Sequence, residues 1–258
     1  MKEINQPDSI VQDPINIPTK LNVIEKNGLY INIKCLPSFL VQKLIQLATF
    51  KNPEFYKAQS KRLSTHGIPR IINCSEEKDG YLILPRGCKD DLIALLNDNS
   101  IDFDFQDDTN SGNDVPLFFE GKLKPEQEQA VENLLENSIG ILSATTGFGK
   151  TVVAAALMTR RNTNTLIIVH RKQLIDQWKD RLLTFLNIKE QQIGQIGGGK
   201  NKQTGIIDIA TIQSLNYKGE IKELITQYGQ IIVDECHHIS AFSFELVLKK
   251  QKQNIFMD

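Results

Sequence analysis

The sequence predicts an α/β fold with a parallel sheet, preceded by a small α+β domain. From residue 139 onward, short apolar runs alternate with helix-length segments, which is typical of parallel strands covered by helices. Before residue 97 only two strand-like and two helix-like runs stand out, and the repeated pattern of strands and helices begins after the boundary. Between the two parts, residues 97–114 hold six Asp residues among Asn, Ser and Gly, and this polar stretch predicts the domain boundary.

The N-terminal part is expected to hold a tail and the small domain. Residues 1–27 are polar, and Pro7, Pro14 and Pro18 interrupt any helix, so we expect a flexible tail there. The small domain is expected at residues 28–115. Its expected elements are strands at 29–33 and 81–84 and helices beginning at Pro37 and spanning 90–96.

The α/β domain is expected at residues 116–258. Its strands are expected at 139–144, 165–169, 206–210 and 231–233. Its helices are expected at 150–160, 172–186 and 221–228. In open α/β sheets, ligands bind at the carboxyl ends of the strands, so functional residues are expected directly after these strands.

Composition excludes several classes of protein. Apolar residues make up 40% and charged residues 24% of the 258 positions, an ordinary globular balance. No apolar run is long enough to cross a bilayer, so no membrane association is expected. The four cysteines form no C-x-x-C pair, which argues against a zinc site or a disulfide framework and favours a reducing, cytoplasmic location.

The charge of the chain is distributed unevenly, but the net charge of each half is small. Residues 1–120 hold 13 basic and 17 acidic side chains, and residues 121–258 hold 17 and 14. Neither half has the strong positive charge of a nucleic-acid binder. Any contact with nucleic acid must therefore depend on local groups.

The segment Ala144–Thr151 has the pattern of a phosphate loop. It follows an apolar strand and opens a helix, and its glycines let backbone N–H groups converge on an anion. Lys150 is expected to reach the outer phosphates, and the Thr151 hydroxyl to bind Mg²⁺. The general pattern has Gly where Ala144 stands, and a plain glycine-rich helix cap is the alternative. The expected nucleotide contacts here are Thr145, Thr146, Gly147, Phe148, Gly149, Lys150 and Thr151.

A second candidate site follows the strand at 231–233. Asp234 is placed to hold Mg²⁺, and Glu235 to orient the water that attacks the γ-phosphate. Taken alone, this acidic pair fits an ordinary polar turn after a strand equally well. Together with the upstream phosphate loop, it accounts for both sides of a Mg-nucleotide.

These two motifs, with His237 completing a D-E-x-H box, resemble superfamily 2 helicases of the DEAD/DEAH type. The most similar branch holds XPB-like helicases and type III restriction motors. The resemblance implies a RecA-like P-loop domain and an ATP-dependent helicase. It also implies that ATP and Mg²⁺ are the cofactors, that Gln127 contacts adenine, and that His237 links nucleotide state to nucleic acid.

Further motifs of this family occur in the expected order between the two ATP motifs. Residues 168–174 resemble motif Ia, residues 196–200 a glycine-rich element, and residues 210–215 motif Ic. The resemblance implies that they contact the DNA backbone without sequence preference. By this resemblance, the residues expected to contact the DNA backbone are Arg171, Lys200, Thr211 and Gln213. Taken singly, each also fits a solvated helix start, a loop or a helix cap.

The small domain resembles the one that precedes the motor in XPB-like helicases, and most of all in primase–helicase (TOTE-type) conflict systems. Residues 52–63 and 84–87 carry this likeness. It implies binding of distorted or single-stranded DNA, with Phe55 and Tyr56 stacking on bases and Lys57, Lys61 and Arg62 holding phosphates. Core aromatics beside a wet helix face are an equally good interpretation.

A complete helicase needs a second RecA-like domain, which supplies an arginine finger. The sequence is expected to be the N-terminal portion of such a protein, truncated after its first motor domain, with a possible partner supplying the second. One coding of residues 249–258, read one base out of register, resembles the family's next strand, so we hypothesise a frameshift. The sheet is then expected to have a gap or to be only marginally stable, with Ile255–Met257 at best a partial filler.

The function predicted from the sequence is that of an ATP-dependent helicase or translocase, with weak or no activity in the isolated chain. One alternative is an inactive fragment that serves as a nucleic-acid-binding or regulatory module. An unrelated P-loop kinase is disfavoured because no phosphate-acceptor motif is evident.

Overall fold

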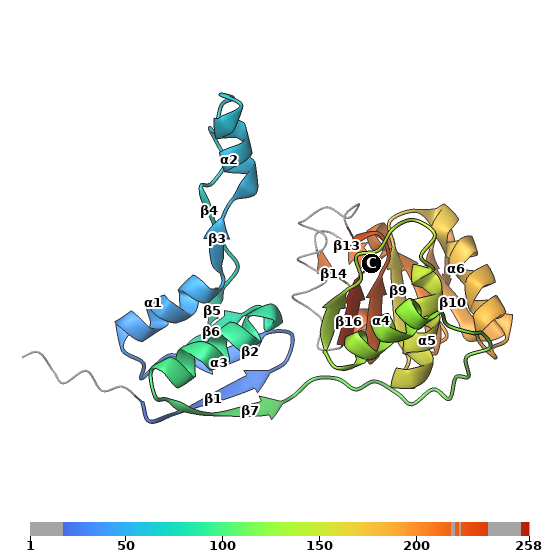
Figure 1. Cartoon of the computed structure of the whole chain (residues 1–258), viewed down its shortest axis with the longest axis horizontal. Helices are drawn as coiled ribbons and strands as arrows, with labels where there is room; N and C mark the ends of the chain where they lie inside the picture. The colour runs from blue at the N-terminus through green and yellow to red at the C-terminus, as the bar shows by residue number, and fades with distance from the viewer. Residues whose placement is uncertain (1–17, 218–219, 222, 237–253, 258) are drawn as a thin grey trace, which may run out of the picture. The chain divides into compact units, whose positions relative to one another are not determined.

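The computed structural model describes residues 18–217, 220–221, 223–236 and 254–257 (Figure 1). The chain divides into two compact units. The first comprises residues up to Ile24 together with Leu29–Gln106, and the second comprises Glu25–Gly28 and the residues from Asp107 onward. None of the described helices is long and apolar enough to cross a membrane.

The first unit is built on a five-stranded sheet in the order β5-β6-β2-β1-β7. Its strands are β1 (Lys20–Glu25), β2 (Leu29–Asn32), β5 (Glu76–Lys78), β6 (Tyr81–Leu84) and β7 (Asp102–Asp107). The helices α1 (Ser38–Leu47) and α3 (Lys89–Asp98) bury leucines in the same core as the strands. A short 3₁₀ turn, η1 (Arg86–Cys88), leads into α3.

Two strands of this sheet correct the sequence prediction. Strand β1 lies within the expected tail, where Leu21 and Val23 alternate with exposed residues and are buried. Strand β7 lies within the expected boundary, where Phe103 and Phe105 pack against the core between exposed Asp side chains. In both segments every second side chain is buried, and this alternation makes each one a strand despite the prolines upstream of β1 and the high charge of β7.

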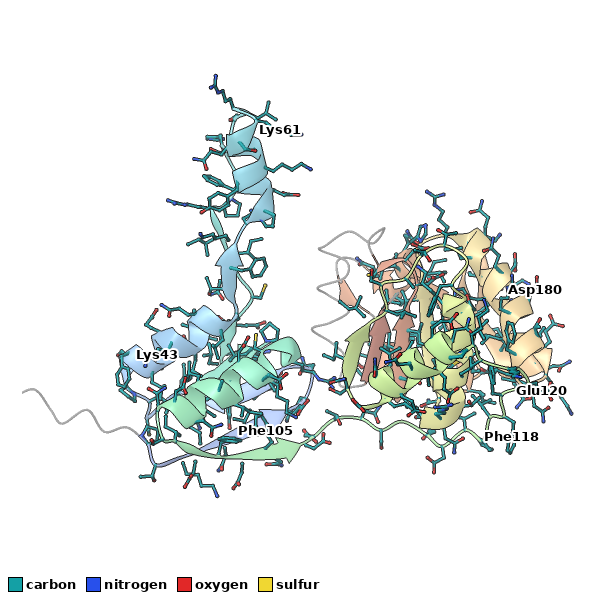
Figure 2. All side chains as sticks on the ribbon, viewed as in Figure 1. Lys43, Lys61, Phe105, Phe118, Glu120 and Asp180 are labelled. Carbon is teal, nitrogen blue, oxygen red and sulfur yellow. The ribbon has the colours of Figure 1, made fainter. Side chains whose placement is uncertain are left out.

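A narrow arm extends from the first unit. Its base is an antiparallel ribbon of β3 (Thr49–Lys51) and β4 (Ile71–Asn73), and it carries α2 (Pro53–Ser60). Helix α2 has no buried residue, and Asn52 caps it by accepting from the Glu54 N–H. Lys61 lies near the free end of the arm (Figure 2).

The second unit contains a seven-stranded sheet in the order β11-β10-β12-β9-β15-β16-β8. Among the described residues, the strands of this sheet pair in parallel, except that the edge strand β11 is antiparallel to β10. The strands are β8 (Ile139–Ile141), β9 (Thr165–Val169), β10 (Ile193–Gly197), β11 (Lys200–Lys202), β12 (Ile207–Thr211), β15 (Gln230–Val233) and β16 (Asn254–Met257). The helices are α4 (Pro125–Leu135), α5 (Lys150–Arg161), α6 (Lys172–Phe185) and α7 (Ile212–Leu215). Smaller elements are η2 (Glu190–Gln192), β13 (Asn216–Tyr217), β14 (Glu220–Ile221) and η3 (Glu223–Gln227).

Both faces of this sheet are buried, which explains the continuous apolar strands. In β9, Ile167 and Val169 pack into a core with α4, α5 and α6, while Leu166 and Ile168 pack into a core with α7 and η3. The predicted α/β fold with a parallel sheet is confirmed. The short helix expected at 221–228 is present only as the 3₁₀ helix at Glu223–Gln227, and its expected start was wrong because β14 ends at Ile221.

The expected gap in the sheet was also wrong. Strand β16 lies between β15 and β8 and pairs in parallel with both, with Ile255 opposite Ile231 and Ile139. Backbone groups make the ladder, so any short run of strand-forming residues can take this place. The sheet is therefore continuous from β8 to β11.

Candidate active site

The loop between β8 and α5 is shaped by two glycines in left-handed conformations. Gly147 has φ of 86° and Gly149 has φ of 92°. A Cβ built on Gly147 would meet no atom within 4 Å, so the space beside it is open. This open space lies at the start of a twelve-residue helix, whose backbone N–H groups and dipole favour an anion.

Gln127 braces this loop from helix α4. Its side chain is buried, and its Nε2 donates to the Phe148 carbonyl at 2.7 Å. Its Oε1 accepts from the Lys124 N–H at 2.9 Å, which caps α4. A Cβ on Gly149 would lie 2.6 Å from Gln127 Nε2, so the brace needs glycine at that position. The adenine contact of Gln127 stays a prediction, because these hydrogen bonds of its side chain are made to the protein itself.

The acidic pair lies directly beyond strand β15. The Asp234 N–H donates to the Ile168 carbonyl at 2.9 Å, which holds the turn against β9. Glu235 has φ of 51°, an uncommon conformation for a residue other than glycine. Lys150 Nζ lies 3.9 Å from Glu235 Oε1. The two motifs that the sequence places far apart therefore meet at one edge of the sheet.

The Asp234 carboxylate has a buried partner that the sequence did not reveal. Trp178 Nε1, on α6, donates to Asp234 Oδ2 at 2.7 Å, and both side chains are buried. Burial raises the pKa of the Asp234 carboxyl, and donation by the indole opposes that rise. Trp178 is the single Trp of the chain and lies in a buried stripe with Ile175 and Leu182. Apolar spacing of this kind is typical of core packing and gives no sign of a polar contact.

The remaining predicted nucleotide contacts lie on the loop and the first turn of α5. Thr145 and Thr146 are exposed, Thr151 is half-buried, and Phe148 packs against the core beside α5. Oxygen donors such as Thr151 and Asp234 are the ligands that Mg²⁺ prefers. Lys150, Thr151, Asp234 and Glu235 thus fit a Mg-nucleotide. His237 lies outside the described residues.

The predicted nucleic-acid contacts follow strands of the same sheet. Because β9, β10 and β12 are parallel, their carboxyl ends share one edge, where Arg171, the 197–199 loop and Thr211 lie. Arg171, Lys200 and Gln213 are exposed, whereas Thr211 is only 7% exposed. Arg171, Lys200 and Gln213 are therefore the accessible members of this set.

Hydrogen bonds tie these loops to one another. Gln213 Nε2 donates to the His170 carbonyl at 3.3 Å. Ser214 Oγ contacts the carbonyls of Ile196 and Thr211, each at 2.7 Å. A Cβ on Gly197 would lie 2.6 Å from Thr211 Oγ1, so a larger residue there would separate the loops. The three loops form one connected surface beside the acidic pair.

Comparison with known proteins identifies relatives of this chain. Residues 120–258 match the family model described as "Type III restriction enzyme, res subunit". The putative DNA 3'-5' helicase Rad25 of Haloarcula marismortui is 26% identical over 72% of this chain and 33% of its own length. The DNA 3'-5' helicase XPB of Kineococcus radiotolerans is 33% identical over 50% of this chain and 24% of its own length.

Two further comparisons extend across both units. The putative ATP-dependent RNA helicase L396 of Acanthamoeba polyphaga mimivirus is 31% identical over 91% of this chain and 43% of its own length. The crystal structure of the UvsW helicase from bacteriophage T4 aligns over 92% of this chain and 91% of that one. Its TM-score is 0.65 at 17% identity, which shows a shared fold. The chain spans less than half the length of these three curated relatives.

Proposed function

Because this chain belongs to the family of the type III restriction enzyme res subunit, we propose that it carries the first ATP-binding domain of a nucleic-acid helicase or translocase. The observation that carries the proposal is the approach of Lys150 Nζ to Glu235 Oε1 at 3.9 Å. It joins the phosphate loop to the acidic pair at one site. The cofactors proposed for this site are ATP and Mg²⁺.

Each residue has a distinct role in the proposed reaction. The loop from Thr145 to Gly149 and the Lys150 ammonium hold the phosphates, and Thr151 and Asp234 hold Mg²⁺. When bound, Mg²⁺ neutralises charge on the β- and γ-phosphate oxygens. Glu235 orients the attacking water and accepts its proton. A second RecA-like domain, from the rest of the protein or from a partner, completes the site.

DNA-stimulated hydrolysis tests this proposal. ATP turnover by the purified chain is measured alone, with single-stranded DNA and with forked DNA, beside the Glu235→Gln variant. Stimulation by DNA that disappears in the variant supports a motor. DNA binding that persists without any turnover supports the alternative of a nucleic-acid-binding module.

The arm favours that second function independently of the ATP site. Residues 49–73 hold five Lys and Arg residues against one Glu, while residues 1–120 as a whole are net acidic. Phe50, Leu63 and Ile71 are at least half exposed there. Tyr56 accepts a hydrogen bond from Arg70 Nε at 3.1 Å, and its ring contacts Phe55 edge-on at 5.5 Å. A basic arm with apolar side chains at its surface has the chemistry of a single-strand contact.

Replacing Lys57, Lys61 and Arg62 together with Ala is expected to weaken single-stranded DNA binding about 10-fold or more. The slope of log affinity against log salt is expected to fall by roughly 2, because each lost phosphate contact removes about 0.7. The measurement is a titration of a labelled oligonucleotide at several salt concentrations. Replacing the exposed Lys34, Lys43 and Lys78 with Ala changes net charge equally outside the arm. Equal effects of the two triple variants would argue against a role for the arm.

Trp178→Phe is expected to weaken Mg²⁺ binding by about 10-fold. Phe keeps most of the packing but removes the donor to Asp234 Oδ2, and loss of such an outer-shell partner typically costs 10–100-fold in metal affinity. The measurement is the Mg²⁺ concentration needed for half-maximal binding of a fluorescent ATP analogue. A melting temperature within a few degrees of the parent excludes unfolding as the cause. An unchanged Mg²⁺ requirement would show that the indole does not position the carboxylate.

A further inference from the structure

Strand β10 contains a buried polar side chain whose position calls for an explanation. Gln195 is only 6% exposed, between apolar neighbours in the strand. A buried carboxamide is destabilising unless both of its groups are hydrogen-bonded. Here Nε2 donates to the Gly197 carbonyl at 3.0 Å, and Oε1 accepts from Lys179 Nζ at 2.7 Å. Gln195 therefore connects the glycine-rich loop to helix α6 and fixes the position of one ammonium group.

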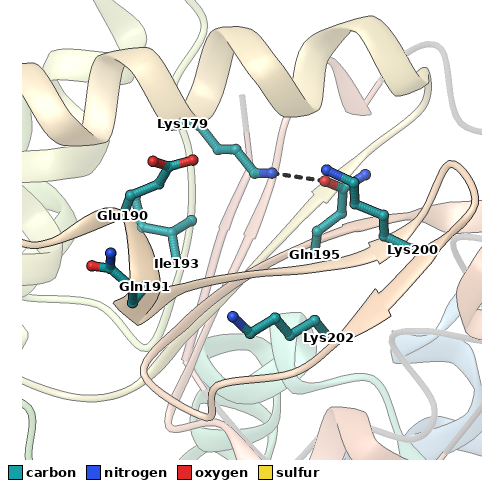
Figure 3. A pocket seen from close by; sticks show the side chains of 7 residues that line it. All are labelled: Lys179, Glu190, Gln191, Ile193, Gln195, Lys200 and Lys202. Carbon is teal, nitrogen blue, oxygen red and sulfur yellow. Dashed lines mark hydrogen bonds between the residues drawn. The ribbon is translucent and has the colours of Figure 1, made fainter.

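That ammonium lines a pocket of about 210 Å³ between α6 and the β10–β11 edge (Figure 3). Lys200 and Lys202 line it as well, and they stand opposite Gly197 and Gln195 in the antiparallel ladder. Residues two apart on a strand face the same side, so β11 presents both lysines together. Glu190 is the one carboxylate of the lining, which leaves an excess of two positive charges.

Protection of the sheet edge explains only part of this arrangement. Lysines on an edge strand discourage pairing with other chains, which accounts for Lys200 and Lys202. It does not account for Lys179, which lies on a helix, or for the buried amide that holds its ammonium in the pocket. Three ammonium groups around one hollow match the chemistry of a phosphate group.

We propose that this pocket binds one phosphate group of a nucleic-acid backbone, with Lys179 and Lys202 as contacts and Gln195 as the positioning residue. The inference rests on the proposed function, since it extends the surface of Arg171, Lys200 and Gln213 to the edge of the sheet. The pocket adjoins the 197–200 loop, so a strand that contacts Lys200 reaches it directly. No sequence preference is expected, because a phosphate carries no base identity.

The test uses the full chain and a labelled oligothymidylate, without ATP, at several salt concentrations. Lys179→Ala combined with Lys202→Ala is expected to weaken binding about 10-fold and to lower the salt slope by roughly 1.4, or 0.7 for each lost contact. Arg181→Ala combined with Lys122→Ala is the control, because both residues are exposed outside the pocket and the charge change is equal. Equal behaviour of the two double variants overturns the proposal.

Gln195→Leu supplies a variant with unchanged charge. It releases the Lys179 ammonium, and we expect a loss of affinity of about threefold with little change in salt slope. Binding as tight as in the parent would overturn the positioning role.

Inorganic phosphate distinguishes the source of the ligand. Its effect on melting temperature is compared with that of chloride at equal ionic strength, in the parent and in the pocket variant. Stabilisation by phosphate that only the parent shows, without any change in oligonucleotide binding, would overturn the backbone assignment in favour of free phosphate. A failure of the proposed motor function would be detected by a different measurement, because the parent chain would then show no DNA-stimulated ATP hydrolysis.

Discussion

Lys150→Ala is expected to weaken ATP binding strongly, whereas Glu235→Gln is expected to keep binding and lose turnover. Removing the ammonium takes away the charge that holds the outer phosphates, for which we expect a loss of affinity of about 100-fold. Removing the base leaves the phosphates held and lowers hydrolysis by about 100-fold or more. The distance of 3.9 Å between Lys150 Nζ and Glu235 Oε1 should enlarge the difference in ATP binding between the two variants. Gln at position 235 no longer attracts the ammonium, so binding by this variant should equal or exceed that of the parent.

Two measurements on the same samples separate these outcomes. A fluorescent ATP analogue with Mg²⁺ reports binding, and phosphate release with saturating single-stranded DNA reports turnover. Lys122→Ala, an exposed site away from the loop, controls for the loss of a positive charge. Loss of binding in both active-site variants would indicate that Glu235, with its left-handed backbone at φ of 51°, shapes the site instead of acting as a base. Parental turnover in Glu235→Gln would remove it from the proposed mechanism.

Local patterns were sufficient to predict the elements around the ATP site. The boundaries of β9 and β6 agree with the expected strands at 165–169 and 81–84, because each is an apolar run with clear limits: Asn164 and His170 flank β9, and Gly80 and Pro85 flank β6. Helix α5 begins at Lys150 as expected, because the preceding glycines cannot continue a strand and open the helix. Parallel strands bring their carboxyl ends together, so the order of motifs along the chain already indicated one shared edge.

Contacts between distant residues could not be predicted in the same way. The bond from Trp178 to Asp234 joins residues 56 positions apart and depends on how α6 lies against the sheet. The brace from Gln127 to the Phe148 carbonyl likewise follows from the packing of α4 beside the loop. A pattern of apolar spacing predicts which side of a helix is buried, but not which polar atom it meets.

The arm and strand β16 show two other limits. Within the arm, only residues 52–63 were interpreted from the sequence, as a DNA-contacting segment or as core aromatics beside a wet helix face. The ribbon of β3 and β4 was missed, since strands of three residues leave little periodic signal. Residues Ile255–Met257 were expected to fill the sheet only in part, because their sequence does not resemble the strand of the family. The place of β16 between β15 and β8 rests on backbone pairing with both neighbours, which does not depend on resemblance to the family.

A buried carboxylate in β12 is expected to make Gly194→Ala strongly destabilising. Asp208 is fully buried and accepts hydrogen bonds from the Thr204 and Gly205 N–H groups, each at 2.8 Å, and from the Tyr228 hydroxyl at 2.6 Å. Burial and this bond raise the pKa of Tyr228, so the phenol stays a donor. Gly194 lies opposite Asp208 in the parallel ladder between β10 and β12.

A Cβ on Gly194 would lie 1.6 Å from Asp208 Oδ1, so Ala must displace the carboxylate from its donors. Overpacking and a disrupted buried charge together are expected to lower the free energy of unfolding by about 3 kcal/mol. For a chain of this size that corresponds to a drop in melting temperature of roughly 6–12 °C. Gly199→Ala is the control, since its φ of 87° is strained but a Cβ there would meet nothing within 4 Å. Its expected cost is about 1 kcal/mol, and an equal loss in both variants would show that backbone strain, not the buried carboxylate, decides the stability of this edge.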